Sequence, residues 1–489
     1  MSWALIAILA VPLAGALLSL VDGWRWGRAV TLVAGLLTLG LAVALAVHVA
    51  GGHAVTTAGG WMRLDALGAV FLAATGLLYG MAALFSVGYF AGHEHEHGFR
   101  SYSRRYFALL NVFGWTMVAV PIAADFGTLW VAVELTTIVS ALLVAIDRTD
   151  AALEASWKYV LVASSGLGIA LLAIILLYAT GTTALGDEYV PRFARLFSVA
   201  GTLSDDVVRL SFVLAMVGFG TKAGFVPTHT WLPDAHSEAP APVSSMLSGS
   251  LLAAAFYAAL RFFQVAVAAG DRAFAEHVLV VFGAFSLVVA SLFVLRQPNF
   301  KRLLAYSSIE HMGVVALGIG FGAPLAVAGA LLHVITHASA KGLAFLGSGS
   351  LLRRFDTKEV DGVSGAAVAL PWSGPMFLAA VLALCGLPVS GVFRSEFQIV
   401  SGGLAGSQYV GVAIVLVFVN VAFFGLLWHA ARMVLGPASP GAPRGEISPW
   451  MVAGMAGCLV VLVALGVHLP DRLSALLHHA VALLHAPAA

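Results

Sequence analysis

The chain has 489 residues, of which 60% are hydrophobic and only 10% carry a charged side chain. About a quarter of the residues of a soluble protein are charged, so this composition excludes a soluble domain and predicts a polytopic membrane protein. The formal net charge of +1 and the lack of a long basic run argue against nucleic acid as a partner and leave the lipid bilayer as the main environment.

Cysteine usage limits the chemistry that this chain can carry. Cys385 and Cys458 lie far apart in apolar sequence. Two thiolates supply neither an iron–sulfur cluster nor a four-cysteine zinc site. The alternating His and Glu residues at 93–97 offer metal ligands, but Arg100 follows them and the spacing favours a solvated loop. We therefore expect no metal and no cofactor here, so that any redox chemistry belongs to a partner.

Apolar runs of about 20 residues, the length needed to cross the hydrocarbon core, predict an all-α protein with about fourteen transmembrane helices. The first run lacks the basic start of a cleaved signal peptide and is interpreted as a span. The final piece, 471–489, is too short to cross and is expected to lie on the surface. The predicted spans are 1–20, 29–50, 66–91, 105–123, 126–146, 157–180, 207–230, 242–265, 275–295, 303–321, 324–350, 371–401, 408–435 and 450–468.

The distribution of lysine and arginine predicts the orientation. Loops after odd-numbered spans hold most of these residues, Lys301 among them, whereas the opposite side holds fewer, Arg261 among them. Because cytoplasmic loops carry the excess of Lys and Arg, we expect the odd loops to be cytoplasmic. Both termini would then lie outside the cytoplasm, with the chain in the cell (inner) membrane.

The stretch from Gly218 to Arg261 is chemically the densest part of the chain. It places Lys222, His229 and His236 between membrane-length apolar runs, and Pro227 prevents a regular helix from continuing. A spanning helix that is broken beside a buried cation is typical of a transporter site. The alternative is a cytoplasmic loop between two ordinary spans, with the lysine reaching the interface.

A second break is predicted at Gly386 and Pro388, just before Glu396 and five helices after the first. Breaks separated by an odd number of spans lie in helices of opposite direction, which favours two inverted five-helix repeats. Coincidence is the alternative, since glycine and proline are common in membrane helices. The predicted parts are an N-terminal three-helix segment (1–100), a first repeat (101–265), a second repeat (266–436) and a C-terminal helix with a short surface helix (437–489).

Ionisable groups recur in the same order in the two halves. The first half holds Glu134, Lys158 and Lys222, and the second holds Glu310 with His311, then Lys341, then Glu396. Each charge facing lipid would cost about 2.5 to 3.5 kcal/mol, so six would exceed the stability of a typical domain. These side chains are therefore expected to face one another or water.

His333, His337 and Lys341 are spaced at i, i+4 and i+8, which places them on one stripe of a helix. Such gaps suit bridging water molecules, as a proton relay requires. Histidine takes up and releases protons near neutral pH. The alternative is a core histidine pair satisfied by backbone carbonyls, with the lysine reaching the cytoplasmic side.

Four runs carry a family resemblance: TKAGFVPTHTWLPDAHSEAPAPVSSMLSG, KRLLAYSSIEHMG, HVITHASAKGLAFL and GLPVSGVFRSEF. Together they resemble the antiporter-like, proton-conducting subunits of respiratory complex I and its relatives, a superfamily shared with large subunits of multisubunit sodium/proton antiporters. HSEAPAPVS together with SSIEHMG looks most similar to the hydrogenase-4 component F type. The resemblance covers roughly residues 100–435.

The resemblance implies a fourteen-helix fold with two half-channels joined by a central hydrophilic axis. It also implies that Glu134 pairs with Lys222, that the histidine stripe and Lys341 continue the path, and that Glu396 ends it. Two residues depart from the family pattern: Ala253 stands where many members have a lysine, and Arg394 adds a cation beside the glutamate that could hold it ionised. The chain is also expected to lack the long lateral helix of the largest family member.

The leading hypothesis is a non-catalytic proton-translocating subunit of a complex I-like or group 4 hydrogenase/formate hydrogenlyase-type complex, with other membrane subunits of that assembly as partners. A sodium (or potassium)/proton antiporter subunit without a redox partner is the first alternative, and a structural scaffold with an inactive channel is the second. The residues expected to transfer protons are Glu134, Lys158, Lys222, His229, His236, Glu310, His311, His333, His337, Lys341 and Glu396.

Overall fold

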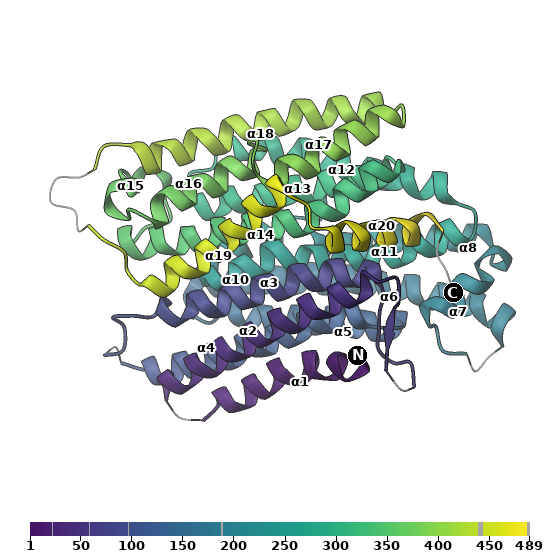
Figure 1. Cartoon of the computed structure of the whole chain (residues 1–489), viewed down its shortest axis with the longest axis horizontal. Coiled ribbons are helices and arrows are strands. Elements are labelled where there is room, and N and C mark those ends of the chain that lie inside the picture. The colour runs from purple at the N-terminus through teal and green to yellow at the C-terminus, as the bar shows by residue number, and fades with distance from the viewer. Residues whose placement is uncertain (22, 58, 96, 187–188, 439–443, 487–489) are drawn as a thin grey trace.

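Long helices run side by side along the length of the molecule in the computed structural model (Figure 1). The structure describes residues 1–489 except 22, 58, 96, 187–188, 439–443 and 487–489. The longer helices are α1 (Ser2–Ser19), α2 (Trp24–Val49), α3 (Ala66–Tyr89), α4 (Phe99–Ala119), α5 (Phe126–Val144), α6 (Asp150–Leu185), α8 (Asp205–Ala223), α11 (Leu252–Ala268), α12 (Arg272–Val294), α13 (Phe300–Gly320), α14 (Pro324–Phe355), α16 (Ser373–Leu384), α17 (Gly391–Ala405), α18 (Tyr409–Leu435), α19 (Pro449–Val467) and α20 (Asp471–His485). The short elements are β1 (Val55–Thr56), β2 (Arg63–Leu64), α7 (Phe193–Val199), α9 (Trp231–Glu238), α10 (Ala241–Met246), α15 (Ala366–Ala369), the 3-10 turns η1 (Val120–Ile122), η2 (Ala200–Thr202) and η4 (Val360–Gly362), and the π-helical turn η3 (Leu247–Leu251).

The middle of the bundle is formed by α3, α13 and α14, which are buried along most of their length. α14 packs against α3, α10, α13, α16, α17 and α19. The outer helices instead expose large apolar side chains, such as Trp157 on α6, Phe285 on α12 and Phe424 on α18. An apolar exterior around a centre that holds the polar residues is the arrangement that a bilayer requires.

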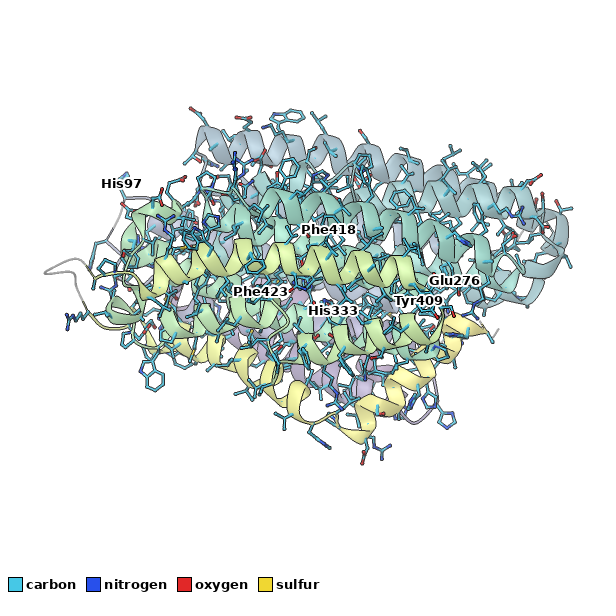
Figure 2. The ribbon with its side chains drawn as sticks, turned by 90° about the horizontal axis from the view of Figure 1, so that it is seen from above. His97, Glu276, His333, Tyr409, Phe418 and Phe423 are labelled. Atoms are coloured by element: carbon cyan, nitrogen blue, oxygen red, sulfur yellow. The ribbon has the colours of Figure 1, made fainter. Side chains whose placement is uncertain are left out.

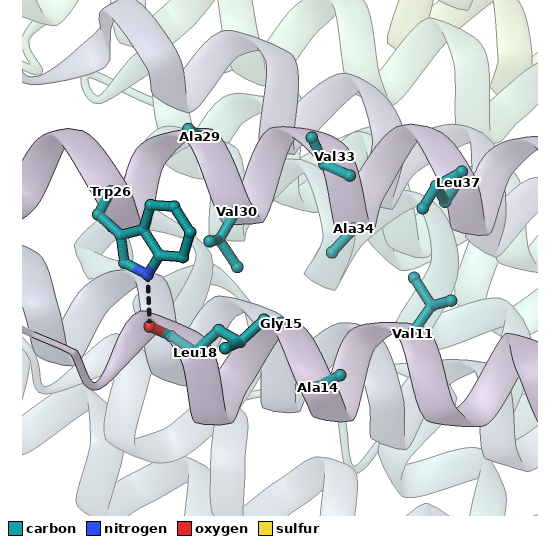
Figure 3. A pocket seen from close by; sticks show the side chains of 10 residues that line it. All are labelled: Val11, Ala14, Gly15, Leu18, Trp26, Ala29, Val30, Val33, Ala34 and Leu37. Atoms are coloured by element: carbon teal, nitrogen blue, oxygen red, sulfur yellow. Dashed lines mark hydrogen bonds between the residues drawn. The ribbon is translucent and has the colours of Figure 1, made fainter.

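An apolar groove between α1 and α2 illustrates this exterior (Figure 3). Val11, Val30 and Val33 line it, and the indole Nε1 of Trp26 donates a 3.0 Å hydrogen bond to the carbonyl of Leu18 at one end. Aromatic side chains with one polar atom are typical of the membrane–water boundary.

Eleven helices in the described part of the chain are long and apolar enough to cross a membrane. The prediction of a polytopic all-α protein is therefore confirmed. The other three predicted spans correspond to α8, α14 and the α16–α17 pair, which carry charged side chains or are interrupted. The total of fourteen and the two inverted repeats stay predictions.

Both predicted helix breaks are present. The predicted span 207–230 was too long, because α8 already ends at Ala223, where Gly224 adopts a left-handed conformation (φ +85°) and closes the helix before Pro227. The second break separates α16 from α17, and its Gly386 also has a positive φ (+67°). Each break therefore leaves an irregular loop beside the ionisable groups.

The C-terminal helix α20 lies on the bundle, with Leu476, Leu477 and Leu484 buried against α3 and α14 while Asp471 and His478 remain exposed. One side of this short helix thus faces the core. Its expected place at the membrane surface stays a prediction.

A close helix crossing fixes α8 beside α6. A Cβ added to Gly166 of α6 would lie 2.7 Å from the Cβ of Thr221, next to Lys222, whereas one added to Gly168 would meet nothing within 4 Å. We therefore expect Gly166→Leu to destabilise the fold by about 1 to 3 kcal/mol or more, because overpacking displaces α8. Thermal unfolding in detergent measures this, with Gly168→Leu as the matched control; equal stability of the two variants would contradict the crossing.

Candidate functional site

Three helices bring His311, His333 and Glu396 together in the buried centre. His311 of α13 and His333 of α14 are joined by a 3.1 Å contact between Nδ1 and Nε2. The carboxylate of Glu396, on α17, lies 3.7 Å from the same Nδ1 of His311. The other nitrogen of His333 lies 2.9 Å from the hydroxyl of Ser395. His333 sits near the middle of the molecule's length (Figure 2).

The remaining groups of the second half extend this cluster along α14. The ring of His337 lies 5.0 Å from that of His311 and 5.9 Å from that of His333. One turn further, the ammonium of Lys341 donates a 2.8 Å hydrogen bond to the carbonyl of Leu304. Glu310 is buried within electrostatic range of Lys341, and one of its carboxylate oxygens has no hydrogen-bond partner. All members of the α14 stripe thus face the same interior.

In the first half, Lys222 and Glu134 have different hydrogen-bond partners. The Lys222 ammonium donates a 2.9 Å hydrogen bond to the carbonyl of Val133 and another to the hydroxyl of Thr137, both on α5. One oxygen of Glu134 accepts a 2.8 Å hydrogen bond from Ser164, and the other is without a partner. Among the described residues no ion pair within 4.0 Å joins Lys222 to Glu134, so the implied pair is open here.

His236 of α9 lies between the two halves. Its ring is 6.0 Å from that of Trp231 and 5.9 Å from that of Phe345, and neither ring nitrogen has a hydrogen-bond partner. Trp231 packs 4.5 Å from the ring of Tyr159, which in turn lies 5.8 Å from the Lys222 ammonium. The imidazole lies within electrostatic range of Lys341 and Lys301, both of the second half, and the rings of Trp231 and Tyr159 separate it from Lys222.

Two predicted residues lie away from this centre. The Lys158 side chain is half exposed and forms ion pairs with Glu154 at 2.6 Å and Asp234 at 3.2 Å. His229 is in the loop after the first break, where its ring lies 6.4 Å from that of Tyr306. Lys158 thus faces water and two carboxylates near the start of α6, which is compatible with the expectation that the six charges face one another or water, but it lies apart from the other groups of the predicted path.

Comparison with known proteins places the chain in a family. Residues 123–422 match the family described as NADH:quinone oxidoreductase/Mrp antiporter, transmembrane. The chain belongs to this family. It is 34% identical over 437 residues to a hydrogenase-4 component F homolog of Methylacidiphilum infernorum, covering 87% of this chain and 89% of the relative. It is 28% identical to hydrogenase-4 component B of Escherichia coli, with 83% of this chain and 62% of that protein covered.

Solved structures agree with this assignment at the level of the fold. A chain of the Mrp complex from Dietzia sp. superposes with a TM-score of 0.88 at 21% identity, covering 99% of this chain and 98% of that one. A chain of respiratory complex I from Thermus thermophilus gives 0.83 at 22% identity, covering 98% and 99%. The protein is thus an antiporter-like membrane subunit, similar to subunits of multisubunit membrane complexes.

Two residues of this antiporter-like subunit, Ala253 and Arg394, differ from the family pattern. Ala253 is buried in α11 and supplies no titratable group. Arg394 donates a 3.4 Å hydrogen bond to the carbonyl of Leu465 on α19 and, among the described residues, forms no ion pair with Glu396. The expectation that this arginine holds the glutamate ionised is therefore wrong in this structure, because residues two apart on a helix point in different directions.

Sequence reasoning missed several polar groups of the centre. Lys301, counted as a loop charge, is buried and donates a 2.6 Å hydrogen bond to the carbonyl of Ala239. Ser395 contacts His333, and a pair of hydroxyls, Ser248 and Ser308, meets at 2.7 Å between η3 and α13. Serines give little signal in a membrane sequence because they also satisfy their own helix carbonyls.

Proposed function

We propose that the chain moves protons across the membrane along its buried Glu, Lys and His side chains, as a subunit of a complex I-like or group 4 hydrogenase/formate hydrogenlyase-type assembly. The chain is not an enzyme by itself, and its partners would be the other membrane subunits, which carry the redox chemistry. The observation that supports this most is the contact series His311–His333–Ser395 beside Glu396. Titratable groups at contact distance inside an apolar bundle are expected where a proton passes.

The first half would act as the control point of this path. Lys222 rests on neutral oxygens of α5, and a carboxylate oxygen of Glu134 is free on the same helix. A movement that brings the two charges together favours the protonated lysine, whereas separating them in a dry interior favours proton release. The released proton would pass by water and His236 to Lys341, then by the histidines to Glu396.

Protons fit the second half better than sodium does. Sodium, like other hard cations, prefers several oxygen ligands, whereas imidazole nitrogens dominate the contacts around His333. The antiporter alternative keeps one argument, namely the similarity to the Mrp complex chain. We further propose the cell membrane as the location, with both termini outside the cytoplasm, and residues 101–265 and 266–436 as the two half-channels.

Proton flux in liposomes that contain the assembled complex tests the proposal. We expect redox-driven proton movement without added sodium, and His333→Gln should slow it clearly, because glutamine does not titrate and only the neighbouring histidines can then carry the proton. The partner's redox activity with artificial acceptors should continue. His478→Gln, which changes an exposed histidine, is the control. Flux that requires sodium, or full flux in the His333 variant, would end the proposal.

A further inference from the structure

We propose that His311, His333 and Glu396 form a binding site for one Zn²⁺ ion. They supply two imidazole nitrogens and one carboxylate oxygen, and these ligand atoms all lie within 4.8 Å of one another. Two histidines and a glutamate, with a water molecule in the fourth position, are a common zinc ligand set. No metal was expected from the sequence, because the three ligands come from three separate helices and show no ligand spacing.

The distances suit a tetrahedral ion. Zinc bonds of about 2.0 to 2.1 Å place neighbouring ligand atoms roughly 3.3 Å apart. The nitrogens of His311 and His333 are 3.1 Å apart, and the same His311 nitrogen is 3.7 Å from Oε1 of Glu396. Side-chain shifts of a few tenths of an ångström would thus bring these two ligand pairs to coordination distance.

The surroundings of the three ligands point to an ion as well. Oε1 of Glu396 is buried and has no hydrogen-bond partner, so it is available as a ligand. The far nitrogen of His333 is held by the hydroxyl of Ser395 at 2.9 Å. A hydrogen bond from the second imidazole nitrogen is the usual way in which proteins orient a metal-binding histidine.

Charge and ligand type favour zinc over the other cations that a membrane protein meets. Two carboxylates, Glu310 and Glu396, face the region against the single ammonium of Lys341. Imidazole ligands select zinc and similar transition metals, and they disfavour sodium, magnesium and calcium, which prefer oxygen.

The second helix break lies directly beside one of the three ligands. The loop residues Leu387 and Val389 are exposed, and Gly386 lies directly against Glu396. A Cβ added to this glycine would lie 2.6 Å from the carboxylate oxygen Oε2. The glycine therefore allows the loop between α16 and α17 to pack directly against this ligand, where any larger residue would meet the carboxylate.

Zinc at this position would also stop proton movement, a consequence that depends on the proposed function. The ion would occupy the nitrogen lone pairs that exchange protons and would tie α13, α14 and α17 together. Zinc binding and the inhibition of proton movement by zinc are independent of each other, so each is measured on its own.

Direct binding tests the site. The full chain, washed with EDTA and placed in nanodiscs, is titrated with Zn²⁺ alone, and the bound metal is counted and examined by X-ray absorption. We expect one tightly bound ion with nitrogen and oxygen neighbours, including two imidazoles. Ser395→Ala should weaken binding about 10- to 100-fold through loss of histidine orientation, and Glu396→Gln should weaken it at least as much.

The triple variant His95→Gln, His97→Gln, His478→Gln removes exposed histidines and is the control for adventitious binding. It should keep the tight site. Zinc that is lost in this control, or unchanged in both Glu396→Gln and His333→Gln, would overturn the proposal. Zinc bound by the three ligands in a complex that still pumps at full rate would support the site and count against the proposed proton path instead.

Discussion

Replacing Lys222 by methionine is expected to abolish redox-driven proton translocation while the partner's redox activity with artificial acceptors persists. The Lys222 side chain is fully buried, and it is the charged group of the first half that sits at a helix break. Methionine keeps the length and apolar stem but carries no proton. Proton uptake by liposomes that contain the assembled complex, measured with a pH-sensitive dye, gives the result.

A second substitution separates charge from proton exchange. Lys222→Arg keeps a positive charge that can still donate to Val133 and Thr137, but arginine does not release its proton in proteins. It should therefore assemble well and still fail to pump. Lys358→Met is the matched control, since this lysine forms a partly exposed ion pair with Glu238 at 2.8 Å. Full coupled pumping in either Lys222 variant would rule out the proposed role.

The open state of the first half explains why this lysine has the larger expected effect. Lys341 is surrounded by groups that can take over a proton, because Glu310 and the histidines lie nearby. Among the residues that the structure describes, Glu134 is the charged neighbour of Lys222. Loss of one titratable group therefore interrupts the first half completely, whereas the second half retains alternative carriers.

The helix breaks and the mid-span charges could be predicted from the sequence, because glycine, proline and ionisable residues inside apolar runs have direct physical consequences. The residues that contact these charged side chains could not be predicted. Ser395 beside His333 and Val133 beside Lys222 depend on which helices pack side by side, and hydropathy along one chain does not determine lateral neighbours. The order of the ionisable groups could be read from the residues, and the resemblance implied that Glu134 pairs with Lys222, but the partners that the two side chains have instead could not be foreseen.

Loop assignments failed for a related reason. Arg261 was counted among loop charges, yet it is buried within α11. The hydropathy of the sequence locates the end of a span only to within a few residues. It also gives no information about an ion partner that lies far away in the sequence. The orientation inferred from loop charges therefore includes one arginine that belongs to the protein interior.

Breaking the buried ion pair between Arg261 and Asp65 is expected to destabilise the fold strongly. Arg261 contacts Asp65 through two 2.8 Å interactions and donates to Tyr257 at 2.7 Å and to Gln264 at 2.8 Å. The side-chain amide of Gln264 in turn donates a 3.0 Å hydrogen bond to the carbonyl of Leu483 in α20. The network thus links the start of α3, which Asp65 caps, to α11 and the C-terminal helix.

Arg261→Met should lower the free energy of unfolding by about 3 to 5 kcal/mol, because it leaves the Asp65 carboxylate buried without its counter-charge. Denaturant titration in mixed micelles measures the loss. Arg432→Met is the matched control: its ion pair with Asp361 is exposed, and such pairs contribute about 0 to 1 kcal/mol. Adding Asp65→Asn to Arg261→Met removes the unpaired charge and should recover part of the loss. If Arg261→Met were no more harmful than the control, or if the double variant were less stable than the single one, the buried pair would not be what holds α3 to α11.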